Sequence, residues 1–231
     1  MILDPEPKGM STPAEFAARR RDPTGPMAYD SEVFSAAQAL IESRQNISPR
    51  RLVEPGPTAR QLDSLLRLAA TAPDHGLLTP WRFIVVPAAQ RARLAEVFAL
   101  ALIDRDPGAT LVQLEAAREK AHRAPLLLVA VAGLGPREPD MPPLERMVSM
   151  GAAIQNILLG SHAMGFGAGL TSGQAMTSPR LHALCGLKDG EAPVCFVNIG
   201  TVSKRKPATR CRPPPSEFVS ELRDDSTPDG T

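Results

Sequence analysis

Residues 72–83 read APDHGLLTPWRF, and this stretch decides how the chain around it is organised. It contains the only tryptophan of the sequence, Trp81, and one of its four histidines, His75. Pro73 disfavours helix in the residue before it, so a helix that arrives here is expected to end there. The apolar residues from Phe83 onward are typical of a buried strand. The stretch is therefore expected to be a rigid loop between a helix and a strand, and it either packs as a turn or holds a ligand.

The segments on both sides of this loop show regular helical and strand-like patterns. Thr58 followed by Gln61 is the signature of a capping box, and it opens the helix that ends at the loop. Helices are expected at 33–41, 58–72, 88–103, 109–122, 144–164 and briefly from residue 178, and strands at 83–86, 126–132 and 194–202. Because long helical stretches separate the strands, the sequence predicts one layered α+β or α/β domain without internal repeats.

Both ends of the chain differ from this middle part. Residues 1–30 are rich in proline and charge and lack a sustained pattern, so they are expected to form a mobile leader. Residues 203–231 are again rich in proline and charge, with one apolar patch at Phe218, Val219 and Leu222. Such an arm cannot fold alone, and it is expected to lie across the body or across a partner subunit.

The composition excludes several classes of function. The chain has 26 basic and 25 acidic side chains, which gives no electrostatic reason to expect nucleic acid as a partner. No apolar run reaches the length of a membrane span, and the N-terminal residues are unlike a secretory signal. The four histidines and three cysteines lack metal-ligand spacing, so no metal site is predicted. A cytoplasmic protein that binds no membrane is expected.

Two further segments have both a structural and a functional interpretation. The glycines of residues 165–169 follow a helix, whereas a dinucleotide-binding loop precedes one, so a tight turn accounts for most of them. Arg44, Gln45 and Asn46 end the first helix, either as a solvated helix end or as an anion clamp. The same two interpretations hold for Arg210 and Arg212 in the tail.

The order of these motifs resembles that of a known family. An arginine-containing helix end is followed by L-x-E-P-x-P-T (52–58) and then by A-P-D-H-G-x-x-x-P-W-R-F. A long helix rich in methionine, G-F-G-x-G-x-x-S-G and a basic tail come after them. This order, over about residues 36–219, resembles the compact bacterial subgroup of the nitroreductase family of flavoproteins.

The resemblance implies a fold and an assembly. The expected fold is α+β, with a nitroreductase-like central mixed sheet flanked by helices. Residues 31–222 would form the FMN-binding domain, with a C-terminal arm from about residue 203 and a disordered tail at 223–231. The chain would form a homodimer in which each arm crosses to the other subunit, with one FMN at each of two subunit interfaces.

The resemblance also implies which residues contact the flavin. Arg44, Gln45 and Asn46 occupy the positions that bind the phosphate and ribityl chain. Thr71 and His75 would contribute across the interface, and the segment Leu170, Thr171 and Ser172 would line the isoalloxazine. The subgroup often has arginine where this chain has Gln45, Thr71 and Thr171. We expect Arg210 and Arg212 of the tail to supply the missing positive charge.

The implied activity requires no catalytic side chain, because the flavin carries the chemistry. The expected function is transfer of hydride from NADH or NADPH through FMN to a nitroaromatic, quinone-like or other electron-poor small molecule. Two alternatives remain open on the sequence. One is another flavin reaction on the same fold, and the other is a non-catalytic flavin-binding protein.

Overall fold

The computed structural model describes residues 31–136, 140–204 and 211–222 of the 231-residue chain. Two compact units are distinguished, residues 1–39 and 40–231, and the fold below is that of the second unit. The expected leader at 1–30, the expected tail at 223–231 and Arg210 lie outside the described residues. Within the described ranges, no helix is both long enough and apolar enough to cross a membrane.

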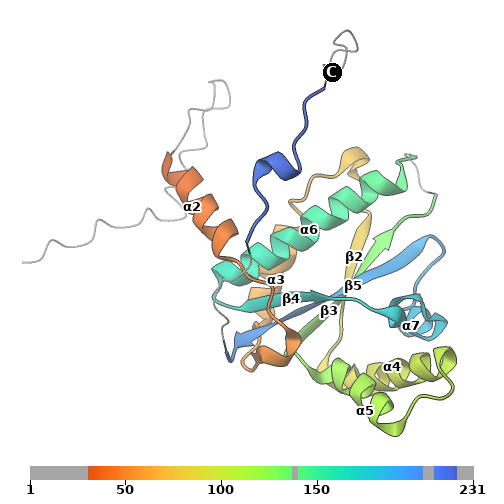
Figure 1. The fold of residues 1–231 in the computed structure, drawn as a ribbon. Helices are drawn as coiled ribbons and strands as arrows, with labels where there is room; N and C mark the ends of the chain where they lie inside the picture. Colours follow the sequence, from red (N-terminus) through yellow and green to blue (C-terminus); the bar gives the residue numbers. More distant parts are fainter. Residues whose placement is uncertain (1–30, 137–139, 205–210, 223–231) are drawn as a thin grey trace, which may run out of the picture. The chain divides into compact units, whose positions relative to one another are not determined.

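A five-stranded sheet forms the centre of the second unit (Figure 1). Its strands are β1 (Leu52–Val53), β2 (Trp81–Val85), β3 (Leu126–Gly133), β4 (Gly167–Thr171) and β5 (Glu191–Val202). β5 pairs with β1, β3 and β4, and β2 pairs with β3. These four pairings are antiparallel, and the parallel element found in the described chain is an isolated bridge between Asn46 and Ala168. Among the described residues, the sheet is thus mixed only through this bridge, which joins Asn46 to β4.

The described residues form six α-helices. They are α2 (Ser31–Ser43), α3 (Ala59–Ala69), α4 (Arg91–Arg105), α5 (Leu111–Glu119), α6 (Pro143–Ala163) and α7 (Pro179–Leu184). The Thr58 hydroxyl accepts from the Gln61 amide, and Gln61 returns the contact to Thr58, which confirms the predicted capping box. The helix expected to end at residue 72 ends at Ala69, because the amides of Thr71 and Ala72 form tighter turn-type bonds to residues three positions earlier.

Helices cover both faces of the sheet, and β3 shows why. All residues of β3 from 126 to 132 are buried, so its side chains alternate between two cores. Leu128 and Ala130 pack in one core with α3 and α6, while Leu127 and Val129 pack in the other with α4 and α7. Figure 1 shows α6 and the α4–α5 pair on opposite sides of the strands. The structure is therefore a layered α+β fold, as expected.

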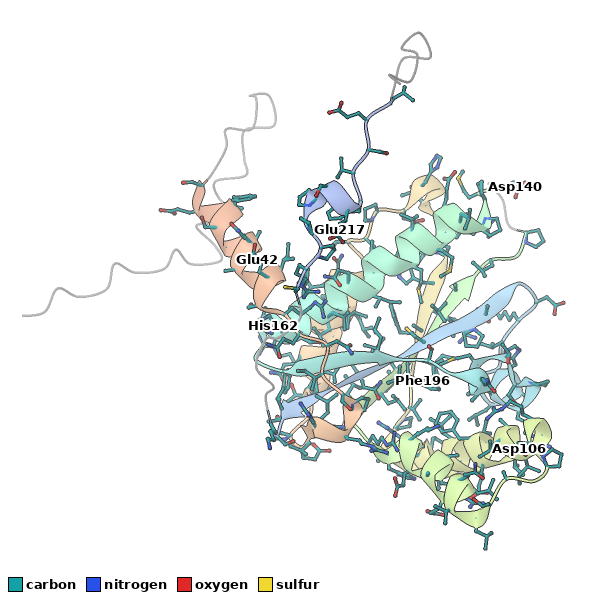
Figure 2. The ribbon with its side chains drawn as sticks, in the orientation of Figure 1. Glu42, Asp106, Asp140, His162, Phe196 and Glu217 are labelled. Carbon is teal, nitrogen blue, oxygen red and sulfur yellow. The ribbon has the colours of Figure 1, made fainter. Side chains whose placement is uncertain are left out.

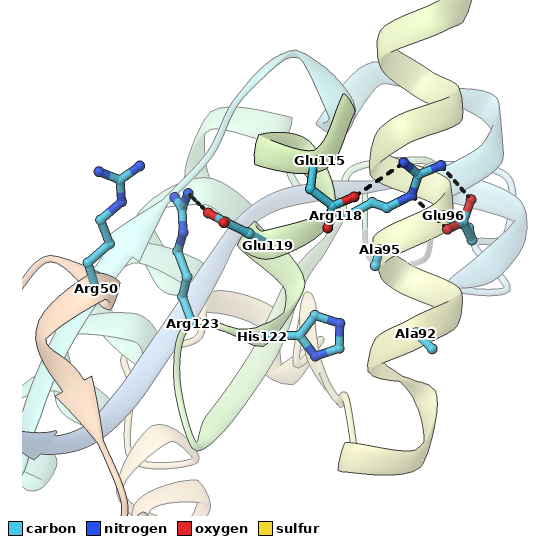
Figure 3. A pocket seen from close by; sticks show the side chains of 9 residues that line it. All are labelled: Arg50, Ala92, Ala95, Glu96, Glu115, Arg118, Glu119, His122 and Arg123. Carbon is cyan, nitrogen blue, oxygen red and sulfur yellow. Dashed lines mark hydrogen bonds and ion pairs between the residues drawn. The ribbon is translucent and has the colours of Figure 1, made fainter. Parts of the chain in front are cut away.

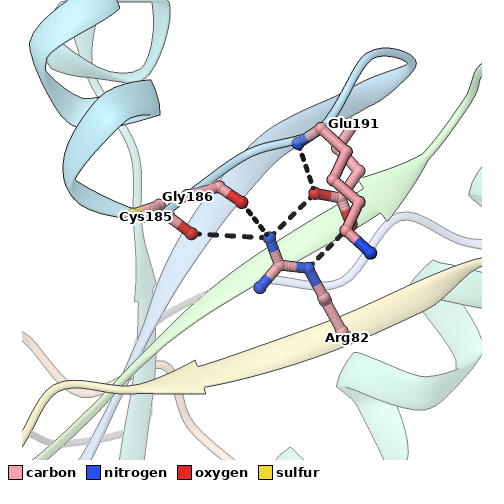
Figure 4. A network of polar contacts seen from close by, with 5 residues as sticks. Arg82, Cys185, Gly186 and Glu191 are labelled. Carbon is pink, nitrogen blue, oxygen red and sulfur yellow. Dashed lines mark hydrogen bonds and ion pairs between the residues drawn. The ribbon is translucent and has the colours of Figure 1, made fainter.

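Arg82 connects β2 to the start of β5 and to the turn that precedes it (Figure 4). Its Nε and Nη2 donate to the two carboxylate oxygens of Glu191 at 2.7 and 2.8 Å, and Nη2 also contacts the carbonyl oxygens of Cys185 and Gly186 at 3.4 and 3.2 Å. The amide of Lys188 donates to the same carboxylate at 2.9 Å. The hydrogen bonds from Arg82 lower the pKa of Glu191 to about 2, and the Lys188 amide adds to this effect.

Glu191→Gln is expected to destabilise the fold at neutral pH and to do so less in acid. Because the folded-state pKa of Glu191 lies below its ordinary value of 4.5, the ionised carboxylate stabilises the fold above that pH. This contribution is lost as the pH falls from 4.5 toward 2. We expect the free energy of unfolding at pH 7 to fall by about 1–2 kcal/mol. This range already allows for solvent screening, because Arg82 is partly exposed.

Urea unfolding at pH 7, 4.5 and 3 measures this difference. The matched control is Glu96→Gln, which removes a similar contact to Arg118 between two side chains on the surface. Its effect at pH 7 should be smaller than that of Glu191→Gln. A destabilisation by Glu191→Gln that is the same at all three pH values would contradict the assigned role of the carboxylate.

Candidate functional site

The segment that follows α2 lies directly against β4. The Ile47 amide donates to the Ala168 carbonyl at 2.9 Å, and the Asn46 Oδ1 accepts from the Leu170 amide at 3.2 Å. Gly169 makes this approach possible, since a Cβ there would lie 2.1 Å from the Ile47 carbonyl oxygen. The structure therefore brings together two stretches that the sequence predicts to be flavin contacts, Arg44–Asn46 and Leu170–Ser172.

Arg44 is half-buried at this corner, and its charge is not balanced within the described chain. Its Nε atom is buried and has no hydrogen-bond partner in the part of the chain that the structure describes. Burial, and then the positive charge of Arg212, lower the pKa of the Arg44 guanidinium. Two arginines that repel one another, one of them with an unsatisfied buried donor, are suited to an anion such as a phosphate. The residues at this corner thus fit the phosphate of FMN.

Ser43 and His162 complete the surroundings of Arg44. The Ser43 Oγ and the His162 Nε2 are 2.8 Å apart, within hydrogen-bond distance, and they connect the end of α2 to the last turn of α6. Both side chains line a small hollow of about 50 Å³ together with Arg44 and Gln45. Neither residue was predicted from the sequence to contact the flavin. In the sequence, each is a polar residue near the end of a helix, and such residues are too common to identify a site.

The other two predicted contacts lie beside α6, with Thr71 next to Asn156 in its second half and His75 next to its first turn. The Thr71 Oγ1 donates to the Leu68 carbonyl at 2.8 Å and accepts from the Asn156 side chain at 3.2 Å. The His75 Nδ1 lies 2.8 Å from a carboxylate oxygen of Glu145, in the first turn of α6. His75 is mostly exposed, and among the described residues its ring is held by Glu145.

The loop that carries His75 has a strained backbone. Gly76, Leu77 and Thr79 have φ values of 76°, 53° and 45°, a conformation that residues other than glycine rarely adopt. The Asp74 Oδ2 accepts from the Thr79 amide at 2.6 Å and holds the turn in place. Trp81 lies not in the loop but in β2, two residues before the expected strand start, and packs against the α3–α6 core. Strain of this kind in an exposed loop is typical of ligand-binding segments.

Within one chain, His75 and Arg44 are far apart. Glu145, which contacts His75, and His162, which borders Arg44, are separated by about 26 Å of helix at about 1.5 Å per residue. Figure 2 shows Asp140 and His162 near opposite ends of α6. One subunit therefore does not bring His75 to the corner that contains Arg44.

Thr171 and Ser172 face a larger cavity on the α4–α5 side of the sheet. This cavity has a volume of about 600 Å³. Asn198, in β5, is buried beside it, and its Nδ2 donates to the Thr171 Oγ1 at 3.0 Å and to the Gly169 carbonyl at 3.2 Å. The end of β4 is thereby held in a fixed position between this cavity and the Arg44 corner.

The C-terminal arm contains the last predicted flavin contact that the structure describes, Arg212. Arg212 is described and exposed, and residues 211–222 are exposed throughout, including the apolar patch at Phe218, Val219 and Leu222. Across the described ranges, no cluster of histidine, cysteine and acidic side chains is arranged to hold a metal ion.

Comparisons with known proteins agree with this architecture. The model of the nitroreductase family matches residues 43–201. The Haemophilus influenzae protein named "Putative NAD(P)H nitroreductase" is 32% identical over 176 residues, which are 76% of this chain and 93% of that protein. The Escherichia coli K12 protein named "Putative NAD(P)H nitroreductase YdjA" is 31% identical over 187 residues, which are 81% of this chain and 99% of that protein.

Solved structures share the fold at lower identity. A nitroreductase-like family protein from Bacillus cereus has a TM-score of 0.69 at 20% identity, covering 87% of this chain and all of that one. The FMN-dependent nitroreductase NfnB of Mycobacterium smegmatis, in complex with NADPH, has a TM-score of 0.63 at 18% identity, covering 83% and 100%. Because the family model spans most of the chain and two relatives exceed 30% identity over nearly their whole length, the chain belongs to the nitroreductase family.

Proposed function

We propose that this protein is an FMN-dependent NAD(P)H oxidoreductase that reduces nitroaromatic, quinone-like or other electron-poor small molecules. The observation that carries the proposal is the buried Nε of Arg44, which has no hydrogen-bond partner among the described residues, beside the positive charge of Arg212. An anion at this corner would satisfy the donor and relieve the repulsion between the two arginines. A solved structure with the same fold is described as an FMN-dependent nitroreductase, NfnB of Mycobacterium smegmatis, which agrees with a flavin phosphate as the anion.

In this proposal the chain binds and orients the cofactor. Arg44 and Arg212 hold the phosphate, with Arg210 as a further candidate from the tail. Gln45 and Asn46 provide amide groups beside it, and the Asn46 Oδ1 is already used to fix the Leu170 amide. Leu170, Thr171 and Ser172 provide the wall for the ring system. When bound, FMN supplies the transfer of hydride from NADH or NADPH to the acceptor.

We also propose that the working form is a homodimer with the site between subunits. The distance between the His75 loop and Arg44 within one chain supports this, since a second copy is required to complete one site. The outward face of α6 supports it further, because Leu144 and Val148 are exposed there. The arm offers Phe218 and Val219, whose exposure in one subunit agrees with packing on the other.

The visible spectrum of the purified protein tests the function. We expect the protein to be yellow, or to become yellow on addition of FMN, and the flavin absorbance to bleach with NADH or NADPH without oxygen. Reoxidation by a nitroarene or a quinone should restore the absorbance. Protein that takes up no FMN would contradict the proposal. Tight FMN binding without reduction by either nucleotide would instead support a non-catalytic flavin-binding protein.

A further inference from the structure

The cavity of about 600 Å³ beside Thr171 and Ser172 has the size and lining of a small-molecule site. Its apolar wall includes Phe98 from α4 and Phe196 from β5, whose rings meet edge to face with their centres 5.4 Å apart. Because it shares Thr171 and Ser172 with the proposed flavin contacts, a molecule in it would lie next to the proposed flavin. The inference below therefore rests on the proposed function.

The charged residues that line this cavity are all basic. They are Arg105, Lys120 and Arg123, and no aspartate or glutamate of the described chain lines it. Arg123 lies 3.6 Å from Glu119, while no ion pair joins Arg105 or Lys120 to a described residue. Arg105 is the last residue of α4 and Lys120 directly follows α5, where basic residues complement the helix dipole. The helix dipole explains why these two residues are basic. It does not explain why both line one cavity that no acidic residue of the described chain lines.

A neighbouring cavity provides the contrast (Figure 3). It is lined by three arginines and by three glutamates, and its ion pairs include Arg118 with Glu96 at 2.8 Å and Arg118 with Glu115 at 3.6 Å. Its charges therefore balance within the chain, as is typical of a solvated surface. The chain as a whole is also close to balance, with a net charge of +1. The excess of positive charge is thus a local property of the cavity beside Thr171.

Asn198 adds a polar group deep in the same cavity. Only 2% of its surface is exposed, and the hydrogen bonds found for it in the described chain all use Nδ2. These bonds fix the orientation of the side chain and leave the Oδ1 as an acceptor for a bound molecule. The cavity therefore offers an aromatic wall, a buried polar group and basic side chains on the helix ends.

We propose that this cavity selects an electron acceptor that carries an anionic group, such as an aromatic carboxylic acid. The aromatic body packs on Phe98 and Phe196, and the carboxylate binds Arg105 and Lys120. The phosphate of NADPH shares this anionic chemistry, and the test below separates the two sources.

Two acceptors of the same shape but different charge, 4-nitrobenzoate and 4-nitrobenzamide, measure the preference in the FMN-loaded protein. We expect kcat/KM to favour the acid, and Lys120→Ala or Arg105→Ala to lower the ratio of acid to amide on the order of tenfold each. Lys120→Glu should reverse the preference. Arg93→Ala, which removes an exposed arginine of α4 outside this cavity, is the matched control and should keep the wild-type ratio.

Binding without turnover provides a second measurement. Calorimetry with 4-nitrobenzoate in the absence of NAD(P)H should show binding that Lys120→Ala weakens on the order of tenfold. If the protein binds the acid in this way but takes up no FMN, the cavity assignment stands and the proposed function fails. If acid and amide are reduced equally well by wild-type protein, the function stands and the cavity assignment is wrong. Variants that change only the KM for NADPH, relative to NADH, would assign the charge to the reductant and overturn the proposal.

Discussion

Arg44→Ala is expected to weaken FMN binding on the order of 10- to 100-fold without destabilising the protein that lacks FMN. Each charge-assisted hydrogen bond to a phosphate contributes about 1.5–3 kcal/mol, which sets this range. In the absence of an anion, the substitution removes the repulsion from Arg212 and a buried donor for which the described part of the chain offers no partner. The melting temperature without FMN should therefore stay equal or rise, while the increase produced by FMN becomes smaller.

Flavin fluorescence titration and thermal melts with and without FMN measure both halves of this expectation. Arg50→Ala is the matched control, since Arg50 is an exposed arginine nearby in sequence that lines the charge-balanced cavity. Arg44→Lys keeps the charge but loses the fork of donors, so its affinity should be intermediate. A flavin affinity that Arg44→Ala leaves unchanged would show that the phosphate binds elsewhere, even if the protein is yellow.

The fold was predictable from the sequence where its determinants are local. The capping box at Thr58 and the apolar run at 126–132 predicted a helix start and a buried strand, and both are confirmed. The family prediction is confirmed as well. The order of the strands was not predictable from periodicity, because β5 pairs with three strands from distant parts of the chain. The start of β2 at Trp81 was missed, since only its pairing with Ala132 defines it.

The candidate site was predictable only as separate pieces. The motifs indicated Arg44 and the end of β4, but not that Asn46 would bind the Leu170 amide. The contact between Ser43 and His162 joins residues 119 positions apart, and no local sequence pattern predicts it. Asn198 lies within an apolar strand and its role depends on the cavity beside it. Residues whose contacts join distant parts of the chain were therefore missed, whereas residues within a contiguous motif could be predicted as candidates.

The face of α6 that points away from the core connects the site to the assembly. Leu144 and Val148 are 80% and 72% exposed, and a Cβ added at Gly151 would meet no atom within 4 Å. Positions 144, 148 and 151 recur at helical spacing, so they form one open apolar stripe. The same helix carries Glu145 beside His75 and His162 beside Arg44. If a second copy packs on this stripe in antiparallel orientation, the His75 end of one subunit lies near the Arg44 end of the other.

Val148→Asp is therefore expected to separate the dimer and, as a consequence, to abolish FMN binding. Burial of a valine side chain contributes about 1.5–3 kcal/mol, and two-fold symmetry counts the loss twice, which corresponds to a weakening of the dimer on the order of 10²–10⁴-fold. The fold of each subunit should persist, because the side chain is exposed in the single chain. Light scattering after size-exclusion chromatography measures the mass, and the same fractions report bound flavin by absorbance.

Val112→Asp provides the matched control for this substitution. Val112 is 79% exposed on α5, so the same change is made on an apolar surface residue outside α6. This variant should stay dimeric and keep its flavin, which would separate loss of an interface from a general effect of an added charge. Flavin bound with full affinity to a monomeric Val148→Asp variant would contradict the two-subunit site, because one chain would then hold the cofactor without the His75 loop of a partner. Loss of flavin from an intact dimer would instead place α6 in the cofactor site but outside the contact between subunits.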